Sequence, residues 1–376
     1  MYGECNLSSS SFAPPTVAEN IMRLQAYVPG KPAEEVQREL GLTSIVKLAS
    51  NENPLGPSPK AQEAIQAMLS RIHIYPDGSA HELRTALAES LSVDPNSLVF
   101  GNGSDDIIHL LGVTFLGPGD TVLQSDPSFV RYEAAAILNE VECIEVPCTS
   151  SWDCDLDAML AKVDASTRLV FLANPNNPTG TAIKSDDLDA FVSQLPERVI
   201  LVLDEAYYEY AKDFDWYPDS VKWVKQERNV VILRTFSKAY GLAGLRVGYG
   251  IMRPEMTQWL ERTREPFNVN LLAQAAAVAA LHDDEFLQRT ITTNRQGLET
   301  IGAALRQMNL QYVPSYGNFL FINVGVDGKV VADSLLHKGV IVRYSPHFKG
   351  PTWIRVTVGT ADENTRFLTA LQEVLA

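Results

Sequence analysis

The chain has 376 residues, which is too long for one compact core and predicts two domains that share a cleft. Hydrophobic residues make up 45% and charged residues 20%, as in proteins that fold around a buried core. The formal net charge of −15 disfavours nucleic acid and anionic membranes as partners, and no apolar run reaches the roughly 20 residues of a transmembrane helix. We therefore expect a cytoplasmic protein that acts on small molecules.

Residues 1–45 are expected to form an N-terminal arm. The opening segment, MYGECNLSSSSFAPP, has neither the basic nor the apolar region of a secretory signal. Its Cys5 and the later Cys143, Cys148 and Cys154 show no CxxC pair. This pattern favours reduced thiols over a disulfide or a zinc site, so no metal is expected.

Residues 46–275 alternate short apolar runs with helical stretches, which is typical of an α/β fold. Most of these runs are continuously apolar, as expected for strands that helices cover on both faces of a mainly parallel sheet. We expect these residues to form a large domain. Its seven predicted strands are Leu98–Phe100, Thr121–Gln124, Val141–Val146, Leu169–Ala173, Val199–Leu203, Val230–Thr235 and Val247–Ile251.

The pattern changes near Asn270, and residues 276–376 are expected to form a smaller α+β domain. The alanine-rich stretch LLAQAAAVAAL predicts a long helix that bridges the two domains. An amphipathic helix is expected over Glu285 to Met308, and later helices near 330–338 and at the C-terminal end. The predicted strands of this domain are Phe319–Val324, Val340–Arg343 and Trp353–Val358.

The segment VVILRTFSKAYGLAGLRVGYG gives the strongest indication of chemistry, because Lys238 follows an apolar strand among small and hydroxyl residues. A lysine at a strand end is by itself most often a solvated surface residue. However, Thr235, Ser237 and Arg246 are the groups that would bind a phosphate dianion beside it. A lysine next to a phosphate site is what a pyridoxal-phosphate (PLP) enzyme needs to hold its cofactor as a Schiff base.

Three other segments supply further parts of such a site. In SLVFGNGSDDIIHLL, Ser104 begins a helix whose free N–H groups would form an anion site. Asp204 ends an apolar strand, where its carboxylate would keep a pyridine nitrogen protonated. Asn177 lies on a tight turn in NPNNPTG and would bind the phenolic oxygen. The LVLDE segment also suits a Mg²⁺-dependent nucleotidase, but the chain has no GxxxxGK[ST] loop.

Taken together, NPNNPTG, DEAYYEY and TFSKAYGLAGLRVGY resemble the signature of the fold-type-I, class II PLP-dependent aminotransferases. More narrowly, the chain resembles the histidinol-phosphate aminotransferase family from Ala26 to Ala376, including AYVPGKP, LASNENPLGPSP, YPDGSAHELRTALA and IRVTVGT. The resemblance implies a large domain with a mainly parallel seven-stranded sheet and a smaller C-terminal α+β domain. It also implies a homodimer with a shared active site.

The resemblance implies a role for each matched residue. Lys238 would hold the cofactor and move the proton in transamination, and Asp204 would pair with the pyridine nitrogen. The other implied cofactor-binding residues are Ser104, Asp105, Thr235, Ser237 and Arg246 at the phosphate, Phe129 on the ring face, Asn177 and Tyr207 at the phenolic oxygen, and Tyr75 at the phosphate of the neighbouring subunit. The implied substrate-binding residues are Arg355, which would grip the anionic end, and Arg343, Tyr27 and Asn53.

Two segments depart from the family pattern, both near the substrate. AYVPGKP lacks the usual proline before its tyrosine, and the loop YSPHFKGPTW is not glycine-rich, with His347 expected at the surface. The leading interpretation is amino transfer between histidinol phosphate and 2-oxoglutarate in histidine biosynthesis. The alternatives are an aromatic amino-acid aminotransferase and a PLP-dependent decarboxylase of a phosphorylated amino acid. A transcription regulator would need a basic DNA-binding segment, which the acidic chain does not offer.

Overall fold

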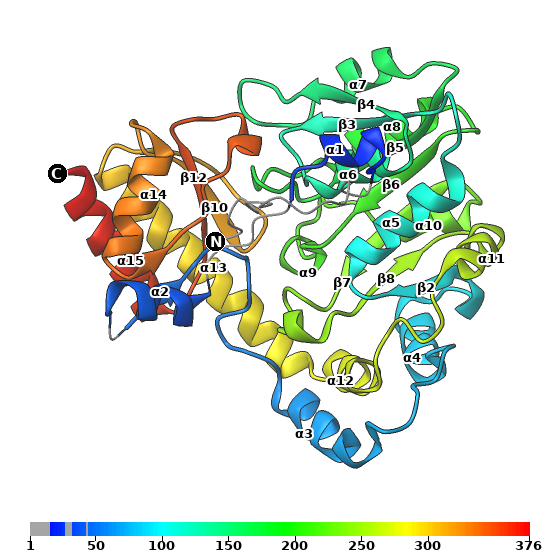
Figure 1. The fold of residues 1–376 in the computed structure, drawn as a ribbon, viewed down its shortest axis with the longest axis horizontal. Coiled ribbons are helices and arrows are strands. Elements are labelled where there is room, and N and C mark those ends of the chain that lie inside the picture. Colours follow the sequence, from blue (N-terminus) through cyan, green and yellow to red (C-terminus); the bar gives the residue numbers. More distant parts are fainter. Residues whose placement is uncertain (1–15, 27–31, 43) are drawn as a thin grey trace, which may run out of the picture.

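The structure is a computed structural model that describes residues 16–26, 32–42 and 44–376. A large lobe surrounds a seven-stranded sheet, and a smaller lobe surrounds a three-stranded sheet (Figure 1). Before the first strand lie two short helices, α1 (Glu19–Arg23) and α2 (Ala33–Leu40). The α1 helix rests on the large lobe, where the Asn20 side chain donates to the Ile137 carbonyl at 3.1 Å.

The large sheet confirms the predicted mainly parallel α/β architecture. All seven predicted strands form, and only β8 runs antiparallel to its two neighbours. Across the sheet the strands lie in the order β2 (Leu98–Gly101), β8 (Gly248–Ile251), β7 (Val230–Thr235), β6 (Ile200–Asp204), β5 (Thr167–Ala173), β3 (Thr121–Asp126) and β4 (Glu142–Pro147).

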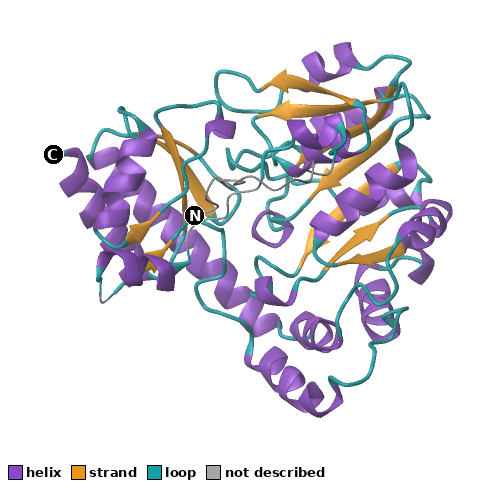
Figure 2. Cartoon of the chain, in the orientation of Figure 1, coloured by secondary structure: helices purple, strands orange, loops and turns teal. Residues whose placement is uncertain are grey.

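Both faces of this sheet are buried, which explains why its strands are continuously apolar. In β5, Val170 and Leu172 contribute to one hydrophobic core, while Leu169 and Phe171 contribute to the core on the opposite face. This alternation follows from the two-residue period of a strand. Figure 2 shows helices on either side of the strands, among them α5 (Ser104–Phe115) and α8 (Ser185–Gln194).

The small lobe contains the antiparallel sheet β12 (Trp353–Thr357), β10 (Phe319–Asn323) and β9 (Gln311–Val313). A separate parallel pair joins β1 (Val46–Lys47) to β11 (Val340–Ile341). The predicted strand Val340–Arg343 is therefore shorter than expected. Beyond it, the backbone of Arg343 forms an isolated bridge with Arg355, in which each N–H donates to the carbonyl of the other, at 3.0 and 2.8 Å.

The two lobes are joined by α13 (Asp284–Gln307) rather than by the alanine-rich helix α12 (Leu271–Leu281) that was expected to bridge them. The alanines of α12 pack into the large-lobe core. In α13, Leu287 and Ile291 pack near Tyr207, whereas Ile301 and Leu305 belong to the small-lobe core. The bridge is thus an amphipathic helix with one end in each lobe.

The remaining helices complete the layers around the two sheets. They are α3 (Pro59–Met68), α4 (His81–Leu91), α6 (Arg131–Leu138), α7 (Leu156–Lys162), α9 (Tyr208–Ala211), α10 (Val221–Lys225), α11 (Pro254–Thr263), α14 (Gly328–His337) and α15 (Ala361–Leu375). None of the helices in the described part of the chain has the length and apolarity needed to cross a membrane.

Candidate active site

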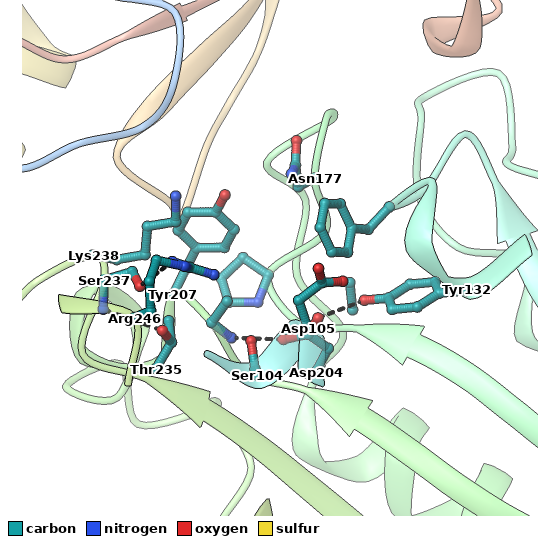
Figure 3. Close-up of a pocket in the computed structure, with 14 residues that line it drawn as sticks. Ser104, Asp105, Tyr132, Asn177, Asp204, Tyr207, Thr235, Ser237, Lys238 and Arg246 are labelled. Atoms are coloured by element: carbon teal, nitrogen blue, oxygen red, sulfur yellow. Dashed lines mark hydrogen bonds between the residues drawn. The ribbon is translucent and has the colours of Figure 1, made fainter. Parts of the chain in front are cut away.

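A pocket lies at the carboxyl ends of three parallel strands, where ligands bind in open α/β sheets. Ala173, Asp204 and Thr235, the last residues of β5, β6 and β7, all line it. The pocket brings together ten residues predicted to bind the cofactor, with Lys238 and Asp204 on opposite sides (Figure 3). These ten are Ser104, Asp105, Phe129, Asn177, Asp204, Tyr207, Thr235, Ser237, Lys238 and Arg246.

The Lys238 amine is held inside this pocket. Its Nζ donates to the backbone carbonyl of Ser50 at 3.1 Å, so a segment far away in sequence fixes its position. Burial and, to a smaller extent, the positive charge of Arg355 together lower the pKa of Lys238 to about 8. The structure thus provides an amine that is far easier to deprotonate than a surface lysine, as a nucleophile or a base requires.

An anion cradle forms where α5 begins. Gly103, the residue before the helix, has a φ of +85°, and a Cβ added there would lie 2.6 Å from Arg246 Nη2. A Cβ added at Gly248 would lie 2.4 Å from the backbone nitrogen of Ser104. The glycines therefore leave room for the guanidinium and the helix N–H groups to approach one ligand. Arg246 Nη1 also donates to Ser237 Oγ at 3.4 Å, which brings a hydroxyl to the same place.

The Asp204 carboxyl is buried and is held by two hydrogen bonds. Tyr132 OH donates to its Oδ2 at 2.7 Å, and the backbone N–H of Ala206 donates to its Oδ1 at 3.1 Å. Burial raises the pKa of Asp204 to about 6, although the Tyr132 hydrogen bond acts in the opposite direction. Sequence reasoning missed Tyr132. Its position three residues after Phe129, at the start of α6, was the available signal, because the two rings pack edge to face at 5.7 Å.

A second network positions the groups expected at the phenolic oxygen. Asn177 Oδ1 accepts a hydrogen bond from Arg355, and this leaves the Asn177 amide nitrogen as the donor available to a ligand. Asn51 Nδ2 donates to Tyr207 OH at 2.8 Å. Sequence reasoning also missed Asn51, which takes a φ of +55° and is fixed through Thr357 in the small lobe.

A second cavity adjoins the first and shares Lys238, Asn177, Tyr207 and Phe129 with it. Its other lining residues include Ser50, Asn51, Arg343, His347 and Arg355. His347 was expected at the surface, but it is half-buried in this cavity wall because the loop that carries it folds over the site.

The pairing of Arg343 with Arg355 determines the direction in which the two arginine side chains of this cavity project. As directly opposed residues of an antiparallel bridge, Arg343 and Arg355 project from the same face. Arg355 is anchored by Asn177 and by the Ala49 carbonyl, to which its Nη2 donates at 2.8 Å. Two guanidinium groups that share a face and line one cavity form a strong site for an anion.

Two predicted site residues that the structure describes, Asn53 and Tyr75, line neither cavity. The Asn53 amide instead donates to the Ala239 carbonyl at 2.9 Å and to Thr290 Oγ1 at 3.1 Å, and so ties the segment before α3 to its surroundings. Tyr75 is 79% exposed and stacks on Phe267 with ring centroids 4.8 Å apart. Tyr27 lies outside the described residues. Their predicted roles remain predictions.

Comparison with known proteins agrees with this geometry. Residues 43–371 match the family model of the class I and II aminotransferases. The histidinol-phosphate aminotransferase of Moorella thermoacetica is 49% identical over 96% of this chain and 94% of its own length. That of Akkermansia muciniphila is 46% identical over 98% of this chain and 100% of its own.

The solved structures give the same picture. The crystal structure of histidinol-phosphate aminotransferase from Sinorhizobium meliloti in complex with pyridoxal-5′-phosphate superposes on this chain with a TM-score of 0.88. The two sequences are 30% identical, and the match covers 97% of this chain and 99% of the other. The likeness thus extends over both lobes.

Proposed function

Because the chain belongs to the histidinol-phosphate aminotransferase family of the class I and II aminotransferases, we propose that it moves an amino group between histidinol phosphate and 2-oxoglutarate. This reaction would belong to histidine biosynthesis. The cofactor of the enzyme is pyridoxal 5′-phosphate. The observation that carries the proposal is that Arg343 and Arg355 share one cavity with the Lys238 amine.

The residues of the first pocket fit this cofactor. The glycine-lined cradle of Ser104 and Arg246 suits its phosphate, with Asp105, Thr235 and Ser237 beside it. The groups proposed around the ring are Asp204 at the pyridine nitrogen, Phe129 on the face, and Asn177 and Tyr207 at the phenolic oxygen. When bound, the cofactor supplies a ring that withdraws electrons from the reacting carbon of the substrate.

Lys238 would do the proton chemistry. Its lowered pKa of about 8 keeps a usable fraction of the amine neutral near neutral pH, so Nζ can take the proton from the α-carbon of the amino donor. The Ser50 carbonyl, which accepts from Nζ at 3.1 Å, holds the amine near the boundary of the two cavities. A proton acceptor in a fixed position avoids much of the entropic cost of orientation.

Arg343 and Arg355 would bind the anionic end of each substrate. Without an anion, two like charges on one face repel each other, and a phosphate or carboxylate between them converts this repulsion into attraction. Arg355 is already fixed by Asn177 and Ala49, so little side-chain entropy is lost on binding. The same pair would hold the phosphate of histidinol phosphate in one half-reaction and a carboxylate of glutamate in the other.

We also propose a homodimer in which Tyr75 reaches the cofactor phosphate of the partner subunit. Its side chain is 79% exposed, and the same segment exposes Leu69, Ile72 and Ile74. Phe267, on which Tyr75 stacks, is itself 43% exposed. Exposed apolar side chains gathered in this way are typical of a subunit interface.

The division into an arm over residues 1–45, a large PLP-binding domain over 46–275 and a small domain over 276–376 is likewise proposed, together with a cytoplasmic location. The arrangement of the two sheets supports the division, because every strand of the large sheet falls between residues 98 and 251. Two elements depart from a simple boundary: β1 pairs with β11 of the small lobe, and α12 extends past residue 275 with Ala276, Ala277 and Ala280 still in the large-lobe core.

Steady-state assays of the purified holoenzyme test the substrate assignment. Histidinol phosphate, phenylalanine and threonine phosphate should each be offered with 2-oxoglutarate, with detection of glutamate and of released carbon dioxide. We expect the highest kcat/KM for histidinol phosphate and no carbon dioxide. A higher kcat/KM for phenylalanine would indicate an aromatic amino-acid aminotransferase, and carbon dioxide from threonine phosphate would indicate a decarboxylase.

A further inference from the structure

His347 lies in the wall of the second cavity, and the proposed function gives it no role. It lines this cavity together with Arg343 and Arg355, on the loop between Arg343 and β12, the strand that carries Arg355. In the described part of the chain its ring makes no hydrogen bond, although its backbone N–H donates to Ser345 Oγ at 3.3 Å. A half-buried imidazole facing a cationic cavity can offer an N–H to an anion there.

The loop that carries His347 is fixed on both sides of the residue. Ser345 caps the single turn of 3-10 helix Pro346–Phe348. Phe348 is buried and packs edge to face on Phe321 of β10, with ring centroids 5.5 Å apart. Lys349 Nζ then forms ion pairs across to the large lobe, with Asp126 at 3.4 Å and Glu145 at 3.5 Å. His347 is therefore placed in the cavity wall by a loop with contacts to both lobes.

We propose that His347 is a specificity-determining residue, whose imidazole donates a hydrogen bond to the phosphate of the amino donor. This inference rests on the proposed function. A phosphate group presents three terminal oxygens, whereas a carboxylate presents two, which a single bidentate arginine can satisfy. A third donor beside Arg343 and Arg355 therefore strengthens phosphate binding and contributes little to carboxylate binding.

The test compares two variants of the holoenzyme, in which the cofactor already occupies the other phosphate site. His347→Phe keeps a ring of similar size and removes the N–H, whereas His347→Gln keeps an N–H donor. We expect His347→Phe to raise the KM for histidinol phosphate and the inhibition constant of inorganic phosphate against glutamate by about tenfold. The KM for glutamate and kcat should remain close to the parent values, and His347→Gln should recover part of the lost affinity.

His282→Phe is the matched control. His282 is an exposed histidine that ends α12 and lines neither cavity, so this change should leave all four constants unchanged. A parallel rise in the KM values of histidinol phosphate and glutamate in His347→Phe would overturn the proposal, because it would indicate a general distortion of the cavity. If His347→Phe changed neither the KM for histidinol phosphate nor the inhibition constant of inorganic phosphate, the proposal would be overturned as well.

Inorganic phosphate separates this inference from the proposed function. If histidinol phosphate is not turned over by the parent enzyme, the proposed function fails, but inhibition by inorganic phosphate still reports on the second cavity. Weaker inhibition in His347→Phe would then still support a phosphate-binding role for His347. Equal inhibition in parent and variant would contradict that role.

Discussion

The Asp204 carboxyl lies under two opposing requirements, because the proposed reaction needs it charged while its buried position favours the neutral form. Burial raises its pKa from an ordinary 3.8 to about 6. The folded chain therefore binds this proton more tightly than the unfolded chain does. In the cofactor-free protein, the contribution of Asp204 to stability is fully present below about pH 4 and is lost as the pH rises through 6.

Replacing Asp204 by asparagine should separate stability from activity. At pH 8, cofactor-free Asp204→Asn should be more stable than the parent by roughly 3 kcal/mol, because it buries no charge. Urea unfolding at pH 8 and at pH 4 measures this, and the gain should shrink toward zero at the lower pH. The same variant should lose transamination with the cofactor bound. An equal gain in stability at both pH values would contradict the assignment of the effect to charge.

The residues that could be predicted from the sequence are those with a motif around them. Lys238 and Asn177 follow strands and Asp204 ends one, each in a recognisable segment, and the structure brings all three into one pocket. Tyr132 and Asn51 were missed because each acts through a partner distant in sequence: Tyr132 through Asp204 and Asn51 through Tyr207. Such contacts depend on the folded arrangement of the elements, and a local pattern does not encode them.

Among the elements, β6 and β7 are linked by a buried ion pair. Glu205 follows β6 and is fully buried, and its Oε2 accepts from Arg234 Nη2 at 2.8 Å and from Nε at 2.9 Å. The Arg234 guanidinium also stacks on Tyr208, 3.4 Å from the ring centre. Removing one partner of such a pair leaves an uncompensated charge in the core.

Glu205→Gln should therefore lower the free energy of unfolding by about 3–5 kcal/mol, because it leaves the Arg234 charge without its counter-charge. Urea unfolding of the cofactor-free protein measures the change. Asp333→Asn is the control, since Asp333 forms an exposed pair with Lys329 at 2.7 Å and its loss should leave the free energy of unfolding nearly unchanged. Equal losses in the two variants would contradict the role given to burial.

Gly103, the residue before α5, and Gly119 together allow the effect of backbone strain to be separated from the effect of a steric contact with Arg246. Gly103 and Gly119 have nearly the same φ, +85° and +87°. A Cβ at Gly103 would meet Arg246, whereas a Cβ at Gly119 would meet nothing within 4 Å. Gly103→Ala should therefore raise the Kd for PLP by at least about tenfold, and Gly119→Ala should not. Fluorescence titration of the cofactor-free proteins measures both values, and equal Kd values would show that Arg246 is not displaced.

At the level of elements, the sequence predicted strands better than connections. The seven apolar runs of the large sheet were recognisable because both faces of each strand are buried. The bridging helix was misassigned because an alanine-rich stretch suits any close-packed position, and α12 uses its alanines to pack against α3 and α4. The loop around His347 was expected near the substrate but His347 itself at the surface, because the packing of this loop depends on the Lys349 contacts with the other lobe.

For the whole molecule, the proposed sharing of Tyr75 between subunits predicts complementation. Homodimers of Lys238→Ala and of Tyr75→Ala should each be nearly inactive. In a mixed dimer, one site combines Lys238 of one chain with Tyr75 of the other and is complete. Unfolding and refolding an equal mixture should restore about a quarter of the parent activity, since half of the dimers are mixed and each has one complete site.

The control for this experiment is the refolding of each variant alone, which should restore no activity. A mixture that stays inactive while the parent refolds with full activity would show that each chain supplies both residues to its own site. Size-exclusion chromatography of the refolded mixture verifies that dimers have formed.

The pairing of β1 with β11 has a consequence for synthesis of the chain on the ribosome. Val46 pairs with Val340, and Asn51 is held by Thr357, so the segment that carries Ser50 and Asn51 reaches its final place only after almost the whole chain has been made. The strands of the large sheet are complete by Ile251 and can form earlier. A nascent chain therefore carries Lys238 in a folded large lobe for some time before the Ser50 carbonyl and Arg355 arrive beside it. The active site is therefore completed after the strands of the large sheet have been made.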